Sequence, residues 1–278
     1  MNFKRVENVA FDSLTLPDIF YKFRTWSNPY HKKTIIDQEF YFAPARELSH
    51  HEYNLSTDYD SVTEEDLYHV FYRHALELHG ITDPDKRRHY ALINILTTEF
   101  TNPSWRSHVD NWFLNRLNNE YGIISLSKTK DNCTTWMNFG IGHTGFAVGL
   151  DPNLMFEDNT IICSAGDVDY YDLNDPPLLK AFCENDQERT NDMLLNMFSL
   201  PDKFSDEDEY RLNKNIMQTG RFLKVKTENI KEIILGHFMS DQHKDEILRD
   251  IKAHLPNVEI KQQILIEEPC KMEFETIN

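Results

Sequence analysis

The sequence predicts an α+β fold with a mixed, mainly antiparallel sheet, and three observations lead to this prediction. Segments with the alternation and aromatic content of strands occur at residues 18–26 and again after residue 122. Between them, residues about 63–121 show the periodicity and caps of helices. Helices and strands are therefore segregated along the chain, which is typical of α+β proteins and not of a doubly wound parallel sheet.

Three helices are predicted within residues 63–121. Thr63 and Asp66 occupy the positions of a capping box, and residues 83–84 (Asp-Pro) and 102–103 (Asn-Pro) each join an N-cap to a proline at the first helical position. We expect this block to form a helical cover that packs on the sheet through Leu67, Phe71, Trp105 and Trp112.

Further strands are predicted where short apolar or alternating runs are bounded by turn residues. They span residues 39–43, 123–127, 145–151, 160–171, 206–213, 221–226, 230–236 and 258–267. A short helix is expected around Trp136, a longer one from Pro176 to about Phe198, and one after Ser240. We expect strands 18–26, 123–127, 145–151 and 206–213 to share one central sheet. The whole chain, 1–278, is predicted to be one domain, with the helix and strand of 240–267 at its C-terminal end.

The chain is strongly acidic, and this narrows the possible partners. It has 46 Asp and Glu against 29 Lys and Arg, a formal net charge of -17. Such a charge repels phosphate backbones and anionic lipid surfaces, so binding of bulk nucleic acid is disfavoured. No stretch of 18 apolar residues and no secretory leader pattern occurs, so we expect a cytoplasmic protein without a membrane span.

Neither the cysteines nor the histidines form a metal-binding pattern. The four cysteines contain no CxxC pair, so we expect reduced thiols and no zinc site. His50, His51 and Glu52 are consecutive and point in different directions. Histidines 69, 74 and 79 are five residues apart, which places them on different faces of a helix. We therefore predict no metal.

The stretch SDEDEYRLNKN, residues 205–215, raises the main functional question. On a strand, Glu207, Glu209 and Arg211 share one face. One explanation is a solvated edge strand with a surface ion pair. The other is the wall of an active site, in which Arg211 keeps a glutamate ionised.

A series of short motifs resembles a known family. The segment 123–151 has a strand ending in Ser-x-Ser, a tryptophan on a short helix, and His-x-Gly-Phe leading into a strand that ends in aspartate. The residues concerned are Ser125, Ser127, Trp136, His143, Gly145, Phe146 and Asp151. With FYKFRTW, VDYYD, DEDEYRL and IKEIILG in the same order, the chain resembles the bacterial family called domain of unknown function 2971 over about residues 19–236. One departure is LSHHEYN, residues 48–54, where that family usually has Asn-Asp-Pro-Phe-Glu, and the role of this loop is open.

The chain also resembles the ADP-ribosyltransferase superfamily, through a basic residue on an early strand, a Ser-x-Ser strand and a later Glu-x-Glu strand. The resemblance implies NAD as substrate and a role as an effector or defence protein. Glu209 or Glu207 would stabilise the cation formed when nicotinamide leaves, as in glycosidases. The other residues implied are Arg24 or Lys22 as donor, Ser125 or Ser127 as positioning hydroxyl, and Tyr21, Trp136 or Tyr210 as the stacking aromatic, with His143 and Arg211 beside them.

Several alternatives remain open from the sequence. Arg24 can be a surface residue, Ser125 and Ser127 plain strand residues, Trp136 core, and His143 a residue that fixes a loop. The whole protein can be a non-catalytic acidic module that docks on a protein partner, either as a binding protein or as an inhibitor. A nuclease using Asp151, Glu207 and Glu209 is a further alternative, which the acidic charge argues against. The transferase hypothesis predicts that Arg24, Ser125 and Glu209 line one cleft.

Overall fold

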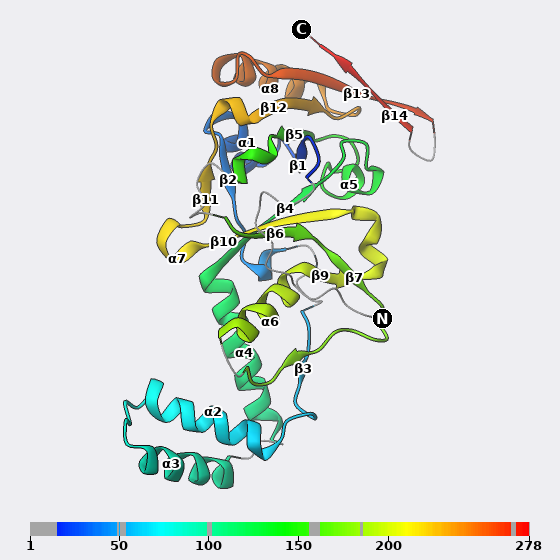
Figure 1. The fold of residues 1–278 in the computed structure, drawn as a ribbon. Coiled ribbons are helices and arrows are strands. Elements are labelled where there is room, and N and C mark those ends of the chain that lie inside the picture. The colour runs from blue at the N-terminus through cyan, green and yellow to red at the C-terminus, as the bar shows by residue number, and fades with distance from the viewer. Residues whose placement is uncertain are drawn as a thin grey trace.

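The computed structural model describes residues 16–48, 50, 54–98, 102–155, 162–183, 186–267 and 271–277. An eight-stranded sheet with the order β14-β13-β12-β5-β1-β4-β10-β6 dominates these residues (Figure 1). Its strands are β1 (Phe20–Arg24), β4 (Tyr121–Ser127), β5 (Phe146–Leu150), β6 (Ile162–Asp167), β10 (Glu209–Asn215), β12 (Ile230–Leu235), β13 (Glu259–Glu267) and β14 (Lys271–Thr276). Neighbours run antiparallel except β12 and β13, which are parallel and are connected through helix α8 (Asp241–His254). The predicted α+β class with a mainly antiparallel sheet is confirmed.

The four strands expected at the centre of the sheet, β5, β1, β4 and β10, are consecutive neighbours in it, and this prediction is confirmed. Smaller two-stranded pairs surround the sheet. They are β2 (Glu39–Tyr41) with β11 (Phe222–Lys224), β3 (Thr57–Asp58) with β8 (Leu179–Lys180), and β7 (Asp169–Tyr171) with β9 (Ser199–Pro201). Short helical turns are η2 (Ala45–Glu47), η4 (Pro152–Met155), η5 (Asp202–Glu207), α7 (Ile216–Thr219) and η6 (Thr227–Asn229).

Helices cover both faces of the sheet. On one face, α8 and helix α1 (Pro29–Ile36) bury Ile251 and Ile35 in the cluster that contains Phe20. On the other face, Trp136 of α5 (Cys133–Asn138) packs edge-on against Phe23, and α6 (Asp186–Phe198) lies beside β10. Because side chains of a strand alternate between faces, Phe20 and Phe23 belong to different layers.

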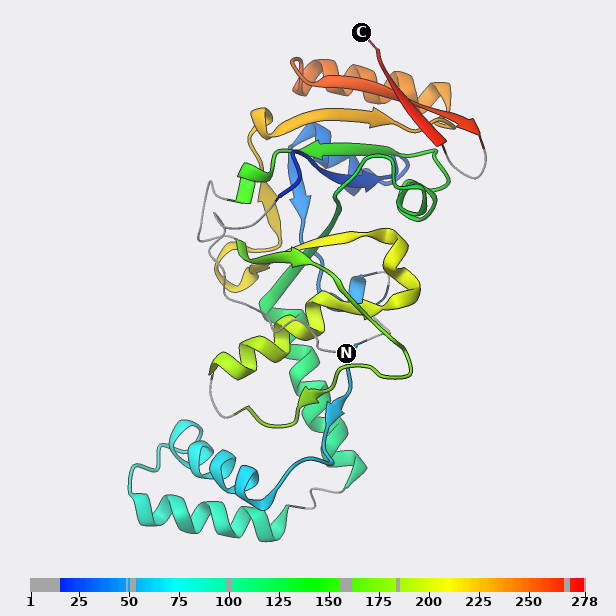
Figure 2. The same ribbon diagram turned by 45° about the vertical axis from the view of Figure 1, so that its right-hand side comes forward.

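The helical block 63–121 differs in part from the expected cover. Helices α2 (Glu64–Glu77) and α3 (Pro84–Thr97) pack on each other at the end of the molecule remote from the sheet, as both views show (Figures 1 and 2). Helix α4 (Pro103–Glu120) reaches the sheet only near its C-terminal end, where Leu117 is buried with Ile123. The prediction that Trp112 packs on the sheet is wrong, since this side chain is 55% exposed. An 18-residue helix is about 27 Å long, so its earlier turns project beyond the core.

Within the described residues, no helix combines the length and apolar character needed to span a membrane.

Two predicted elements begin later than expected. Residues 205–215 are not one continuous strand, because η5 ends at Glu207 and Asp208 is left-handed, with φ 44°. Aspartate tolerates this conformation better than most residues, and β10 starts only at Glu209. The helix expected from Pro176 begins at Asp186, after strand β8.

The cysteine prediction holds only in part. Cys163 and Cys183 carry free thiols, as expected. Cys133 at the start of α5 takes part in a disulfide, so the expectation of a reduced thiol is wrong at this position.

Close backbone packing at Gly145 yields a stability prediction. A Cβ at Gly145 would lie 2.2 Å from the Arg24 carbonyl oxygen, whereas one at Gly166 would meet nothing nearer than the Phe198 ring at 3.8 Å. We expect Gly145→Ala to lower the free energy of unfolding by about 3 kcal/mol, because the backbones of two central segments must separate. Gly166→Ala is the matched control and should change it by less than about 1 kcal/mol. Urea unfolding measures both, and equal effects would contradict the proposed close contact.

Candidate functional site

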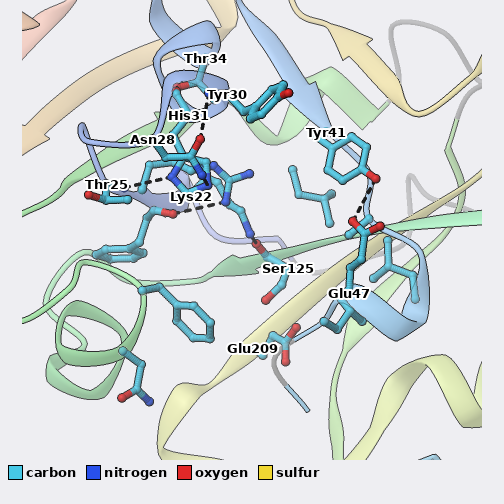
Figure 3. A pocket seen from close by; sticks show the side chains of 18 of the residues that line it. Lys22, Thr25, Asn28, Tyr30, His31, Thr34, Tyr41, Glu47, Ser125 and Glu209 are labelled. Carbon is cyan, nitrogen blue, oxygen red and sulfur yellow. Dashed lines mark hydrogen bonds between the residues drawn. The ribbon is translucent and has the colours of Figure 1, made fainter. Parts of the chain in front are cut away.

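A pocket of about 650 Å³ opens where strands β1 and β4 separate (Figure 3). Strand β1 pairs with β5 along all five residues but with β4 only at Tyr21 and Ser127. Further along β4, Ile123 pairs with Ala43 instead, through hydrogen bonds of 2.8 and 2.9 Å. The sheet is therefore split between two of its central strands, and the pocket occupies this split.

Five predicted site residues line this pocket. They are Lys22 and Arg24 of β1, Ser125 of β4, and Glu209 and Arg211 of β10. In an unbroken sheet, Lys22 and Glu209 would face opposite sides, because Glu209, Ser127 and Tyr21 lie in one row of the register. The split lets side chains of both faces reach one cavity. Arg24, Ser125 and Glu209 thus line one cleft, the geometry that the transferase hypothesis requires.

One side of the pocket is basic. Lys22 Nζ crosses the split and donates to the Ser125 carbonyl oxygen at 2.5 Å. Arg24 Nη1 makes only a long contact of 3.5 Å with the Phe23 carbonyl oxygen, and the buried Arg24 Nε has no partner. Within the described chain, neither Lys22 nor Arg24 forms a salt bridge. Two basic side chains thus face the cavity without a paired carboxylate.

Burial changes the titration of these basic groups. It lowers the pKa of Lys22 well below its ordinary value, and the Arg24 charge lowers it further. Burial also lowers the pKa of Arg24 to about 10, so this guanidinium is still protonated at neutral pH. His31 of α1 has its pKa lowered to about 4, first by burial and then by Arg24 and Lys22, so it is neutral at neutral pH.

The carboxylate of Glu209 is buried and tightly paired. Arg211 Nε and Nη2 donate to its two oxygens at 2.7 and 3.0 Å, and Arg211 Nη1 donates to the Met197 carbonyl oxygen. Burial alone would raise the pKa of Glu209, but the Arg211 charge and hydrogen bonds, the Ser125 hydroxyl and the Lys22 charge outweigh it and lower this pKa. The pair has no net charge, so the protonated guanidinium of Arg24 is an uncompensated positive charge in this pocket.

Other predicted site residues lie outside the main pocket. Trp136 is fully buried and stacks on the buried His143, with ring centroids 5.8 Å apart. His143 Nδ1 donates a hydrogen bond to Gln263 Oε1 at 3.1 Å, and neither Trp136 nor His143 lines the pocket. Both rings therefore support the turn before β5. Tyr21, which donates to Glu232 at 2.7 Å, and Ser127 line only a small adjoining crevice. The structure therefore supports the core and loop-fixing interpretations of Trp136 and His143.

The three carboxylates of the nuclease alternative do not converge. Asp151 pairs with Lys231 at 2.7 Å, Glu207 with His50 at 3.2 Å, and Glu209 with Arg211. Among the described residues, no three histidine, cysteine, aspartate or glutamate side chains gather in a way that could hold a metal ion.

Sequence reasoning missed several residues of the pocket. Helix α1 contributes His31, and residues 28–29 (Asn-Pro) are the same helix-start signal that identified α3 and α4. The open wall carries Tyr41, whose hydroxyl donates to Glu47 at 3.0 Å, and Phe222, whose ring centroid lies 5.4 Å from that of Tyr41. His50 lines the pocket from the divergent loop 48–54, and no local pattern indicated this position.

The buried pair Glu209 and Arg211 makes a testable contribution to stability. Arg211→Met leaves a buried carboxylate without its cation and should cost about 3–5 kcal/mol. The double variant Glu209→Met with Arg211→Met should cost less than the sum of the two single changes, since no charge is left unpaired. Arg88→Met, which breaks the exposed pair with Asp85, is the control and should cost about 0.5 kcal/mol. Urea unfolding measures these free energies, and a double variant whose loss equals the sum of the two single losses would contradict this coupling.

His31 predicts a pH dependence of stability. The pKa of His31 in the folded protein is about 4, below the ordinary value of 6.5. Between pH 4 and pH 6.5 the unfolded chain therefore binds more protons than the folded protein. The stabilising contribution is thus present above pH 6.5 and is lost as pH falls toward 4. Acidification from pH 7 to pH 5 should lower the Tm more in the wild type than in His31→Asn, which keeps an acceptor for the Thr25 amide. Parallel Tm curves for the two proteins would contradict this.

Comparisons with known proteins do not assign this chain to a family: no family model, curated protein or solved structure matches it. The resemblances to domain of unknown function 2971 and to ADP-ribosyltransferases therefore remain predictions, and functional inference rests on the pocket itself.

Proposed function

We propose that the pocket binds NAD and that the protein cleaves the bond between nicotinamide and ribose, transferring or hydrolysing the ADP-ribose part. One observation carries this proposal: the protonated Arg24 lies beside the basic Lys22 in the pocket without a carboxylate partner, in a protein whose formal net charge is -17. Cations desolvated in this way are costly unless a ligand anion compensates them. The pyrophosphate of NAD is an anion of this kind, and a guanidinium binds phosphate through two parallel hydrogen bonds.

The remaining lining fits the other parts of NAD. A volume of about 650 Å³ lies within the usual range of about 300–1,000 Å³ for small-molecule sites. Tyr41 and Phe222 at the open wall offer ring faces on which a base can stack. The pocket thus combines an anion-binding side with an aromatic side.

Glu209 and Ser125 supply the groups needed for the reaction. Departure of nicotinamide leaves positive charge on the ribose, and an ionised carboxylate nearby stabilises that charge. The lowered pKa of Glu209 keeps it ionised at neutral pH. Arg211 occupies one hydrogen-bonding position on each oxygen, and a carboxylate has about four, so a ribose hydroxyl can still donate to it.

A second candidate is binding of the same ligand without turnover. The two-point pairing of Glu209 with Arg211 favours it, because the guanidinium cancels much of the charge that would stabilise the ribosyl cation. The protein would then be a nucleotide-binding module, and its acidic surface would face a protein partner.

Arg24→Met tests the ligand-binding part of the proposal. Removing a half-buried cation that has no carboxylate partner should raise the Tm of the free protein. Binding of NAD and of ADP-ribose should weaken about 10- to 100-fold, the loss typical of one charged hydrogen-bonding group. Thermal shift with increasing NAD, ADP-ribose and nicotinamide measures binding, because a ligand of the folded state raises the Tm by mass action. Arg88→Met, at an exposed position on α3, is the matched control.

Release of free nicotinamide separates the two candidates. Turnover in the wild type supports the transferase or hydrolase, and binding without release supports the module. A wild-type Tm that does not respond to NAD or ADP-ribose would contradict both.

A further inference from the structure

A histidine and a buried glutamate form a second pair at the pocket. His50 Nε2 lies 3.3 and 3.2 Å from Glu207 Oε1 and Oε2. The Glu207 side chain is 3% exposed, and Asn138 Nδ2 donates to its Oε1 at 3.2 Å. His50 and Asn138 both line the pocket that contains Glu209. The His50 imidazole thus lies in contact with the Glu207 carboxylate and also lines the cavity.

The imidazole is held in a defined orientation. Its ring stacks on Phe204, with centroids 3.7 Å apart and 25° between the planes. The backbone that carries Glu207 is fixed as well, since its carbonyl oxygen accepts from Asn132 Nδ2 at 3.2 Å. With Nε2 directed at the carboxylate, Nδ1 remains as the nitrogen that can meet a ligand, and it makes no hydrogen bond within the described chain.

The chemistry of this pair differs from that of Glu209 and Arg211. A buried carboxylate that only needed neutralisation would be served by arginine, whose guanidinium does not release its proton in proteins. Histidine is the side chain that accepts and releases protons near neutral pH. A carboxylate that accepts from one ring nitrogen leaves the other unprotonated, and it stabilises the imidazolium that forms when this nitrogen takes up a proton.

We propose that His50 is the general base of the reaction, positioned by Glu207, and that the acceptor is water or a hydroxyl group. This inference rests on the proposed cleavage of NAD. As the C1′–N bond breaks, its electron pair goes to the pyridinium nitrogen and nicotinamide leaves as a neutral molecule. The acceptor oxygen forms a bond to C1′, and its proton passes to His50 Nδ1. Glu207 Oε1 and Oε2 hold the resulting imidazolium through Nε2.

The roles of the two glutamates are then distinct. Glu209 is next to Ser125 and stabilises the cation, whereas Glu207 acts through His50 on the nucleophile. The acceptor class follows from the base, since only a nucleophile that must lose a proton benefits from it.

The test uses variants that keep the hydrogen bond but remove the base. His50→Gln retains a side-chain N–H for Glu207 and should lower kcat for nicotinamide release about 100-fold or more, with KM changed little. His50→Ala should show the same loss, and added imidazole should restore part of kcat, which a purely structural role would not produce. His69→Gln, on the exposed face of α2, is the matched control.

Glu207 is tested as a positioning residue. Glu207→Gln should lower kcat while NAD still raises the Tm as in the wild type, and Glu207→Asp should recover more activity than Glu207→Gln. Wild-type turnover in both His50→Gln and Glu207→Gln would overturn the base and leave the proposed function intact. Failure of the wild type to release nicotinamide would overturn the proposed function, and this assignment with it.

Discussion

The single pairing between β1 and β4 is the constraint on which the site depends. Strands of one sheet normally pair along their length, which seals the sheet and separates its two faces. Here pairing is limited to Tyr21 and Ser127, and residues near Ala43 take over the edge of β4 at Ile123. The carbonyl oxygen of Ser125 accepts a hydrogen bond from the Lys22 side chain. A side chain thus bridges the two strands, and the space between the strands becomes a cavity.

The distribution of charge follows from that opening. The body of the protein is acidic, yet the split exposes Lys22 and Arg24 to a cavity and not to carboxylates. The neighbouring Glu209 is paired with Arg211 and forms no salt bridge with Lys22 or Arg24 among the described residues. A local basic pocket within an acidic protein is the arrangement that the proposed binding of a small anion needs.

Most of the sheet and part of the site could be predicted from the sequence. Strand periodicity located β1, β4, β5 and β10, because alternation is a local property. The split of the sheet could not be predicted, since it depends on which distant segment pairs with β4. The sequence left Trp136 open between a ligand site and the core, and His143 open between a ligand site and a loop, because either ring can stack in both places. Only the packing of Trp136 against Phe23 and the hydrogen bond of His143 to Gln263 distinguish these. His50 was missed because its partner is 157 residues away.

The two glutamates that opened the functional question differ in environment because of one backbone conformation. On a continuous strand, Glu207 and Glu209 would share a face and repel each other. The left-handed Asp208 lies between η5, which ends at Glu207, and β10, which starts at Glu209. Glu207 therefore does not belong to the strand that carries Glu209. Glu209 then pairs with a permanent cation and Glu207 with an imidazole. Two like groups placed in unlike surroundings can perform different steps of one reaction, and a single left-handed residue makes that division possible here.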